Sequence, residues 1–496
     1  MTARRFVPAG WTLTAPLIAL GLLAGLAAAA APLRWSVLAL GGALGLALAL
    51  WRPLFAVVCA VGLGVTKAFL ARLGYGGFLF DFGQIFLAVA LVGWVARKLL
   101  ARDFTLPVPA LLVPLGVYVF AGAVSLIGAP SYEDGLPELI KWLQIAAIMV
   151  IVVDETRVVD WRWLLAGLCG LALLQGALGL LQYVGRAGSL GFPPDLLESF
   201  RSGPGTFRAF GTFEQPNPFG GFVGLLWPVA AGAALGLLGE VWLRRLAPGG
   251  WRTALRAPAT GLLLLASGAA GIGLAGLYAS SSRGGWVGAA GAAGVMAVFL
   301  PRRWGWSLSA VAGGLAVVGL ALSLNLVPAN ISARLASAVD FIGVEDVRGV
   351  SISNENFAVV ERLAHWQAAL GMIEAHPWFG VGLGNYAAAY ETYRLLNWPN
   401  ALGHAHNIYL NVWAETGLFG LVTYFALWGS VVWITIGGLR HSQGLERGVL
   451  IGLLGAWTHL SLHQLFDNLY VNNIHLLLAA LLGLLAYHHG KQRSTD

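Results

Sequence analysis

The chain has 496 residues, of which 58% are hydrophobic and only 11% charged, and its mean hydropathy is +0.74. Soluble domains carry about 25% charged residues, so the composition excludes an ordinary soluble protein and indicates a polytopic membrane protein. The net charge of +7 does not indicate nucleic-acid binding, because no basic patch interleaved with aromatic residues occurs on a polar segment. The two cysteines lie in apolar runs, which excludes a disulfide framework and a CxxC metal site.

Apolar runs between polar breaks predict the spanning helices, each of which needs about 20 residues. The candidate runs are 11–31, 35–50, 54–71, 79–96, 108–127, 138–153, 161–184, 217–239, 258–279, 285–300, 304–327, 407–437, 447–466 and 470–488. Short early runs can merge or re-enter, so we expect about 12–14 transmembrane helices, the first of them an uncleaved span. The predicted fold class is therefore all-α, a polytopic integral membrane protein with one large helical loop.

The distribution of Lys and Arg predicts the orientation of the chain. If the N-terminus is cytoplasmic, the inner loops hold well over half of the basic residues and fewer than a third of the acidic ones. Both termini are therefore expected inside. The loops at 185–216, 280–284, 328–406 and 467–469 then all face outward, and they carry the densest polar chemistry.

Four regions follow from this topology. They are N-terminal helices over 1–200, helices with two arginine motifs over 201–327, an outer helical loop over 328–406 and C-terminal helices over 407–496.

The first arginine motif is RAFGTFEQPNPFGG, which contains Arg208 and Asn217. Two prolines flank Asn217 at a junction between loop and helix, where free backbone N–H groups can bind an anion. A guanidinium binds phosphate in a bidentate manner that Lys does not reproduce. The alternative is a helix cap beside an arginine that reaches lipid headgroups.

The second motif, SSSRGGWVG, places Arg283 in a tight turn between two apolar runs. Outer loops are poor in arginine, and charges at the membrane boundary are functional hypotheses by default. The competing interpretation is an anchor for lipid headgroups.

The outer loop contains ENFAVVERLAHWQAALGMIEAHP, which predicts an amphipathic helix ended by Pro377. Its apolar face is expected at Phe357, Val360, Leu363, Ala364 and Leu370. Its charged members, Glu361, Arg362, His365 and Glu374, suggest a solvated face, although Arg362 could reach a phosphate. The following FGVGLGN lacks the preceding strand of a phosphate-binding fingerprint, so tight packing is the favoured interpretation.

The motif GHAHNIYLNVWAETG places His404, His406 and Asn407 at the mouth of the next span, and Glu415 inside it. A histidine with a pKa near its ordinary value of about 6.5 is a suitable general base. Glu415 is costly in lipid unless it has a partner. About two and a half helical turns separate it from His406, so direct contact is not expected in a continuous helix.

A further stripe of His459, His463 and Asp467 follows i, i+4, i+8 spacing. Its HExxH glutamate is absent, so helix packing or a substrate channel is favoured over a metal site. No DxD motif, P-loop or GxSxG motif occurs. We therefore expect no metal and no other cofactor.

Four motifs in chain order resemble those of the O-antigen ligase/polymerase superfamily. They are GTFEQPNPFGG, SSSRGGWVG, ERLAHWQAALGMIEAHPWFGVGLGNY and HAHNIYLNVWAETGLFGL. The resemblance covers about residues 200–425 by motif and the rest by hydropathy only. It implies an inner-membrane glycosyltransferase of the GT-C type that acts at the periplasmic face without a metal.

The resemblance also implies substrates and roles. The donor would be a glycan on undecaprenyl diphosphate, within a bilayer of membrane lipids, and the acceptor lipid A–core or another lipid-linked glycan. Arg208 and Arg283 match arginines thought to hold the diphosphate, Arg362 matches a recurrent arginine of the outer loop, and His406 matches the candidate base. Glu214 departs from the family pattern and would repel a phosphate if it pointed inward.

The motifs slightly favour a ligase. A polymerase that extends the lipid-linked repeat and an oligosaccharyltransferase to protein stay open as alternatives. A lipid-linked substrate transporter or flippase is the main alternative from another class. It predicts charges near the bilayer midplane and an inverted repeat, whereas the polar residues here cluster at one face.

Overall fold

The computed structural model of the protein describes residues 45–71, 81–185, 192, 194–203, 205–246, 250, 257–301, 309, 312–314, 316, 320, 346–353 and 356–493. The expected spans 11–31, 35–50 and 304–327 lie wholly or largely outside these residues.

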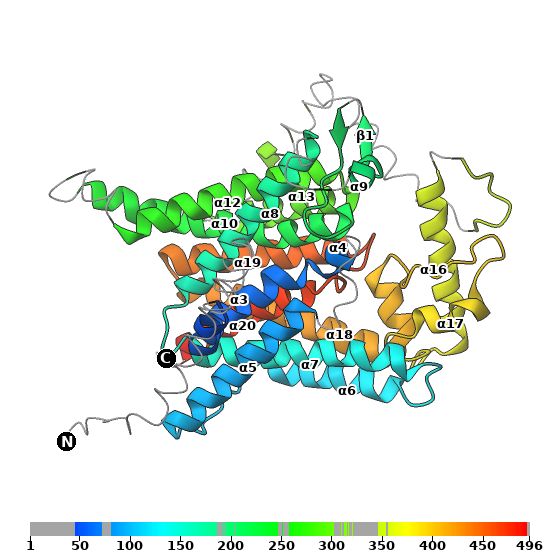
Figure 1. Cartoon of the computed structure of the whole chain (residues 1–496), viewed down its shortest axis with the longest axis horizontal. Coiled ribbons are helices and arrows are strands. Elements are labelled where there is room, and N and C mark those ends of the chain that lie inside the picture. The colour runs from blue at the N-terminus through cyan, green and yellow to red at the C-terminus, as the bar shows by residue number, and fades with distance from the viewer. Residues whose placement is uncertain are drawn as a thin grey trace, which may run out of the picture.

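The described elements are almost all helical (Figure 1). The N-terminal helices are α3 (Pro53–Gly64), α4 (Lys67–Leu70), α5 (Phe82–Ala101), α6 (Leu112–Ser125), α7 (Tyr132–Glu155), α8 (Arg162–Tyr183) and α9 (Pro194–Glu198). A two-stranded antiparallel hairpin, β1 (Arg201–Gly203) and β2 (Thr206–Phe207), precedes α10 (Pro216–Arg245), α12 (Pro258–Ser280) and α13 (Arg283–Phe299). The remaining helices are α16 (Phe357–Ala375), α17 (Tyr386–Tyr393), α18 (Ile408–His441), α19 (Gly444–His463) and α20 (Ile474–Arg493).

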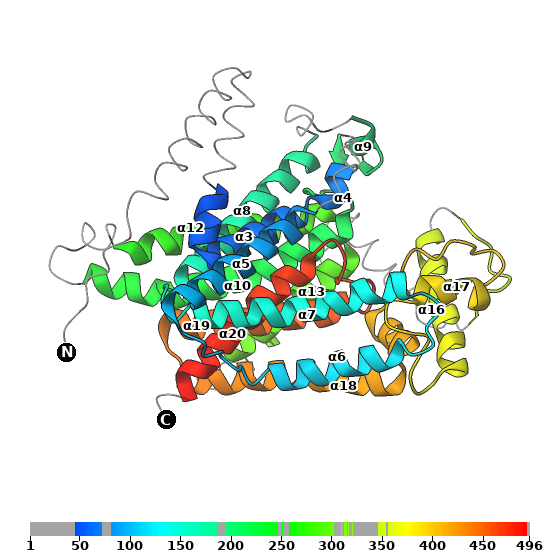
Figure 2. The same ribbon diagram turned by 60° about the horizontal axis from the view of Figure 1, so that its bottom comes forward.

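Six of the described helices are long and apolar enough to cross a membrane: α5, α7, α8, α10, α12 and α18. The helices form an elongated bundle, with α16 and α17 at one end and the C-terminal end of α20 at the other (Figures 1 and 2). The prediction of an all-α polytopic membrane protein is confirmed. We call the end that carries α16 and α17 the loop end.

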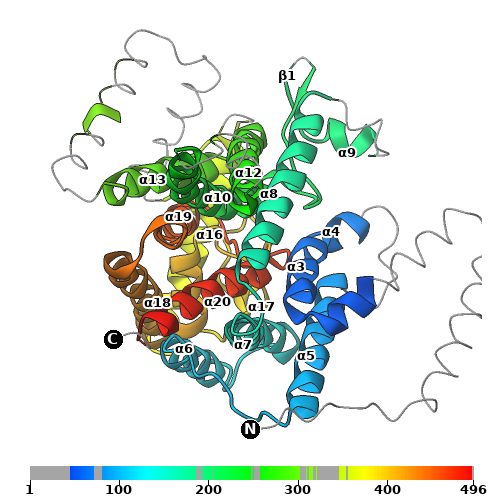
Figure 3. The same ribbon diagram turned by 90° about the vertical axis from the view of Figure 1, so that its left-hand side faces the viewer.

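Helix α20 lies in the middle of the bundle, with other helices around it when the structure is viewed along its length (Figure 3). Its residues from Leu476 to Leu485 are buried. This helix is apolar on all sides, as expected for a helix enclosed by others.

Helices α10 and α19 pack backbone to backbone. A Cβ atom at Gly232 would lie 2.1 Å from the carbonyl oxygen of Gly448, and one at Gly452 would lie 2.5 Å from that of Pro228. Small residues permit such close approach between membrane helices. This contact fixes the start of α10, which carries Asn217, relative to the loop after α19, which carries Asp467.

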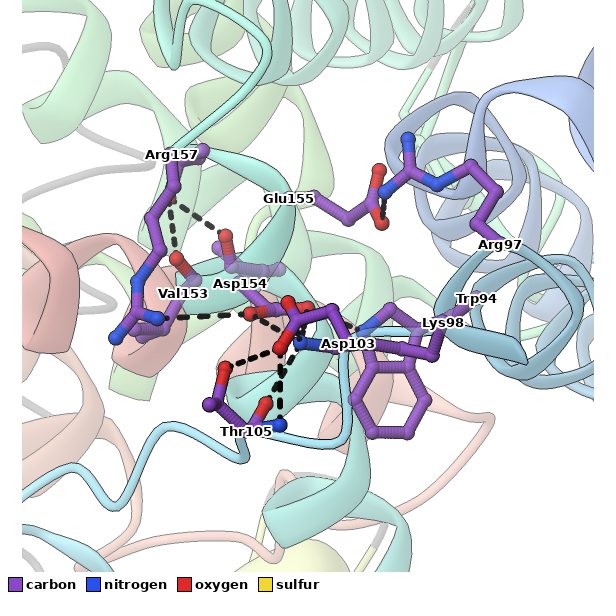
Figure 4. Close-up of polar contacts among 11 residues, drawn as sticks. Trp94, Arg97, Lys98, Asp103, Thr105, Val153, Asp154, Glu155 and Arg157 are labelled. Atoms are coloured by element: carbon purple, nitrogen blue, oxygen red, sulfur yellow. Dashed lines mark hydrogen bonds and ion pairs between the residues drawn. The ribbon is translucent and has the colours of Figure 1, made fainter. Parts of the chain in front are cut away.

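Charged side chains join α5 and α7 at the end opposite α16 (Figure 4). Lys98 Nζ lies 2.9 Å from Asp154 Oδ2 and 3.0 Å from Asp103 Oδ2, and Trp94 Nε1 donates a hydrogen bond of 2.8 Å to Asp154. Arg97 pairs with the buried Glu155. Pairing compensates the charge of the buried Glu155, and removal of Arg97 would leave that charge uncompensated. The network ties together the ends of two predicted spans.

The outer loop docks onto α18 at a break in that helix. Gly417 has φ 65° within α18, and the backbone N–H groups of Val381 and Gly382 donate to the carbonyls of Ala414 and Glu415 at 2.9 and 2.8 Å. A residue other than glycine at 417 would place its Cβ 2.2 Å from the carbonyl carbon of Trp378. The expected span over 407–437 corresponds to α18, which is interrupted at Gly417, where the backbone of the outer loop lies against it.

Three further expectations need correction. The expected span 54–71 is divided into α3 and α4, and the outer segment 185–216 contains α9 and the β1–β2 hairpin. The amphipathic helix of the outer loop is confirmed as α16, but its buried face differs. Phe357 and Leu370 are exposed, while His365 is buried.

Candidate functional site

Two adjacent cavities lie at the loop end of the bundle. The first, which we call the arginine cavity, has a volume of about 250 Å³ and is lined by Arg208, Arg283 and Arg362. The second, which we call the histidine cavity, has a volume of about 480 Å³ and is lined by His404 and His406. Asn217 and Asp467 line both cavities, so the two spaces share a wall.

Arg208 follows strand β2 and is held by hydrogen bonds from three directions. Its backbone N–H donates to Phe200 O at 2.7 Å, its Nε donates to Ser280 O at 3.0 Å, and its Nη2 donates to Asn217 Oδ1 at 3.1 Å. The side chain therefore bridges the end of α12 and the start of α10. Asn217 holds the guanidinium at the cavity wall.

Arg283 is the first residue of α13, and the turn before it is shaped for an anion. Ser281 has φ 52° and ends α12, and Ser282 caps α13 by accepting a hydrogen bond of 3.3 Å from Gly285 N. Ser281, Ser282, Arg283 and Gly284 all line the arginine cavity. The N-terminus of a helix favours negative charge, so the start of α13 and the guanidinium of Arg283 both favour an anion.

His463 supports this turn from behind. Its Nε2 lies 3.3 Å from Ser282 Oγ, and its Nδ1 lies 3.3 Å from His459 Nε2. A Cβ atom at Gly284 would lie 2.6 Å from His463 Cδ2, so glycine is required for this contact. His459 therefore packs behind the turn, whereas His463 both supports the turn and lines the arginine cavity.

Arg362 comes from α16, in the outer loop, and completes the arginine cavity. Its Nη1 donates a hydrogen bond of 3.1 Å to Ala358 O in the preceding turn. Its Nε is buried and has no hydrogen-bond partner among the described residues. A buried donor left unpaired in this way is costly, and a ligand oxygen in the cavity would satisfy it.

His406 and His404 meet Asp467 at the wall between the cavities. His406 Nδ1 lies 3.7 Å and His404 Nε2 3.9 Å from Asp467 Oδ1, and the two imidazole rings are 4.4 Å apart. Neither ring nitrogen of His406 has a hydrogen-bond partner among the described residues. Both nitrogens are buried, so the ring is positioned by packing and by the nearby carboxylate.

The backbone around His406 is tightly specified. His406 has φ 53°, and its N–H donates to His404 Nδ1 at 3.0 Å. Asn407 caps α18 by accepting hydrogen bonds from Tyr409 N and Leu410 N, and Asn411 Oδ1 accepts one from Ala405 N. A left-handed conformation at a residue other than glycine is uncommon and clusters at functional sites.

The charges of this group follow from burial and neighbours. Burial alone would raise the pKa of Asp467, but the His406 imidazole, His404 and Arg362 outweigh it and hold that pKa well below its usual range. Burial, with a smaller effect of His406, lowers the pKa of His404 to about 4. At neutral pH, Asp467 is therefore a carboxylate and His404 is neutral.

Two imidazoles and a carboxylate are also a set of metal ligands. The ligand atoms of His404, His406 and Asp467 lie within 4.8 Å of one another. A cation held there would lie beside the arginine cavity, whose charge is positive. The positive charge of the arginine cavity favours an anion in that cavity, next to Asp467.

Glu415 has the partners that its position in an apolar helix requires. Its carboxylate accepts hydrogen bonds from Gly384 N at 2.9 Å and Tyr386 N at 3.1 Å. It therefore fixes the glycine-rich loop to α18, although it also lines the histidine cavity. No hydrogen bond to His406 is present among the described residues, in agreement with the sequence-based expectation.

Sequence reasoning missed two residues of this site. Asp467 was assigned only to the histidine stripe, yet its Oδ1 also lies 3.9 Å from His404 Nε2 and 3.7 Å from His406 Nδ1. His365 was expected on a solvated face, yet it is buried 5.7 Å from the His406 ring, with Nδ1 3.0 Å from Tyr386 Oη. An acidic residue at the outer end of an apolar helix was the available signal for Asp467.

Comparison with known proteins identifies a family. The family model described as O-antigen ligase matches residues 268–425. This segment contains Arg283, Arg362, His404 and His406, whereas Arg208 and Asp467 lie outside it. No curated protein matches the chain.

Proposed function

Because the chain belongs to the O-antigen ligase/polymerase superfamily, we propose that it is a glycosyltransferase that moves a glycan from undecaprenyl diphosphate to a sugar hydroxyl. The acceptor is lipid A–core if the protein is a ligase. The single observation that carries the proposal is the wall shared by the arginine and histidine cavities. In this proposal the arginine side holds the diphosphate, and the histidine side holds the base and the acceptor hydroxyl.

The arginine cavity suits the diphosphate of the donor. Three guanidinium groups and the N-terminus of α13 converge there. Charge develops on the diphosphate as the glycosidic bond breaks, and preorganised donors in a site screened from water stabilise such charge. Diphosphate is itself a good leaving group, so the chain needs no strong acid on this side.

The histidine cavity suits the acceptor. With Nδ1 of His406 directed toward Asp467, Nε2 is left to accept the proton of the acceptor hydroxyl. The hydroxyl oxygen forms the new bond to the anomeric carbon, and the electron pair of the old bond leaves with the diphosphate oxygen. Attack opposite the leaving group inverts the anomeric carbon without a covalent sugar–enzyme intermediate. The carboxylate of Asp467 stabilises the imidazolium that forms.

The same arrangement supports the proposed location. We place the loop end at the periplasmic face of the bacterial inner membrane, with both termini in the cytoplasm. The basic residues of the predicted inner loops and the α5–α7 charge network at the opposite end support this orientation. The donor lipid then reaches the site after it has crossed the membrane.

The proposal is tested by transfer in nanodiscs. Purified protein receives undecaprenyl-diphosphate glycan with and without lipid A–core, and products are identified by mass spectrometry. Glycan on lipid A–core identifies a ligase, and a longer undecaprenyl-linked chain without that acceptor identifies a polymerase. Donor that binds and crosses the bilayer with no transfer would instead support the flippase alternative.

A further inference from the structure

The two cavities differ in the sign of their charge. The arginine cavity has three guanidinium groups against one carboxylate, that of Asp467. The histidine cavity is lined by four acidic side chains, those of Glu138, Glu214, Glu415 and Asp467, and by one ammonium, that of Lys141. The side that suits the acceptor is therefore acidic.

Lys141 offsets one of these charges. It pairs with Glu138 and donates a hydrogen bond of 3.3 Å to Tyr470 O. Glu214 lies in the segment just before α10 and has φ 68°, which turns the chain sharply there. Glu214 lines the histidine cavity and is not among the residues that line the arginine cavity. It is therefore not placed to repel a diphosphate in the arginine cavity.

The rest of the histidine cavity suits a neutral sugar. Its wall carries the amide side chains of Asn217, Asn411 and Asn472, which both donate to and accept from hydroxyl groups. Its aromatic members include Trp142 and Tyr470, whose ring centroids are 4.9 Å apart. Binding sites combine apolar and aromatic walls with a few polar groups in this way.

Resting on the proposed function, we propose that the histidine cavity is the acceptor subsite and selects an uncharged sugar next to the reacting hydroxyl. A phosphate or carboxylate there would meet Glu214 and Asp467 in a medium of reduced dielectric constant, where like charges repel strongly. The arginine cavity next to it would also attract such a group away from the position required for attack. The residues that line the two cavities therefore disfavour an acceptor with a negative charge beside the reacting hydroxyl.

The test compares two synthetic lipid-anchored acceptors in nanodiscs. One carries a neutral oligosaccharide, and the other carries the same oligosaccharide with one phosphate monoester beside the acceptor sugar. We expect the wild-type protein to use the neutral acceptor at least about tenfold more efficiently in kcat/KM. Glu138→Gln, which releases Lys141, and Glu214→Gln should each narrow this ratio by at least about threefold.

Glu133→Gln is the matched control, because Glu133 lies on α7 with Glu138 but is exposed and outside the cavity. It should leave the ratio unchanged. Equal use of both acceptors by the wild-type protein would overturn the inference, and so would a preference that persists unaltered in both cavity variants. Absence of transfer to either acceptor would instead overturn the proposed function on which the inference rests.

Discussion

His406 Nδ1 lies 3.7 Å from Asp467 Oδ1, although the two residues belong to segments on either side of helices α18 and α19. Ile408 N donates to Gln464 O at 3.0 Å and holds these segments together. Asp467 also lines the arginine cavity, so one carboxylate faces both the candidate base and the guanidinium groups. We therefore expect Asp467 to stabilise the imidazolium of His406 and to weaken binding of the donor diphosphate. These two effects can be measured separately.

Replacement of Asp467 by Asn should separate turnover from donor binding. Asn keeps the shape but removes the charge that stabilises the His406 imidazolium, so kcat should fall about a hundredfold or more. Donor affinity, measured by titration of undecaprenyl-diphosphate glycan, should stay the same or increase, because a negative charge leaves the arginine cavity. Asp195→Asn, at an exposed position on α9, should change neither quantity. Equal loss of binding and turnover would contradict the role assigned to Asp467.

Arg283 should act through the geometry of its guanidinium as well as its charge. We expect Arg283→Ala to reduce transfer about a hundredfold or more, as for the loss of one preorganised donor. Arg283→Lys keeps the charge and loses the bidentate contact, so most of the defect should remain. The control is Arg348→Lys, because Arg348 is exposed and pairs with Asp346. Full activity of Arg283→Lys would show that charge alone is sufficient.

The neutral state of His404 predicts a dependence of stability on pH. Burial lowers its pKa to about 4 in the folded protein, below the ordinary value of 6.5. The unfolded chain therefore binds more protons between these values, and stability falls as the pH is lowered through this window. The contribution is at most about 3 kcal/mol, complete above the unfolded pKa and lost toward the folded one.

The measurement for His404 is the thermal unfolding temperature in detergent between pH 7 and pH 4. His404→Asn should show a smaller decrease than the wild-type protein, whereas replacement of the exposed His376 by Asn should show the same decrease as the wild-type protein. An unchanged decrease in His404→Asn would mean that His404 is not the buried neutral group described here.

Gly417 should be essential for docking of the outer loop. In Gly417→Ala, the new Cβ would lie 2.2 Å from the Trp378 carbonyl carbon at a residue with φ 65°. We expect a loss of stability of more than about 2 kcal/mol, with loss of transfer because α16 carries Arg362. Gly429→Ala, on the same helix with open space at its Cβ, should change stability by less than about 0.5 kcal/mol. Equal stability of the two variants would contradict the docking described.

Transfer should not depend on a divalent metal ion. The guanidinium groups supply the positive charge that a metal would provide to a diphosphate, and Asp467 is already held as a carboxylate by its neighbours. Activity after treatment with EDTA and dialysis should equal that of the untreated protein. Loss of activity that is restored by Mg²⁺ or Zn²⁺ would instead identify His404, His406 and Asp467 as a metal site.

The sequence predicted the fold class and most residues that line the two candidate cavities, because their signals are local. Apolar run length indicates spanning helices, and Arg208, Arg283 and His406 each lie in a short polar motif between such runs. Asp467 and His365 were misplaced because their roles depend on contacts between distant segments, which spacing along one helix does not encode. The break at Gly417 was missed for the same reason, since its cause is the backbone of Trp378 from another loop.

The most direct test of the proposed chemistry measures both products of the reaction together. Wild-type, Arg283→Ala and His406→Ala proteins are incubated in nanodiscs with donor and acceptor, and released undecaprenyl diphosphate is quantified beside the glycosylated acceptor. We expect equal amounts of the two products from the wild-type protein and a loss of about a hundredfold or more in each variant. Full turnover by His406→Ala, or donor bound by the wild-type protein without either product, would contradict the mechanism.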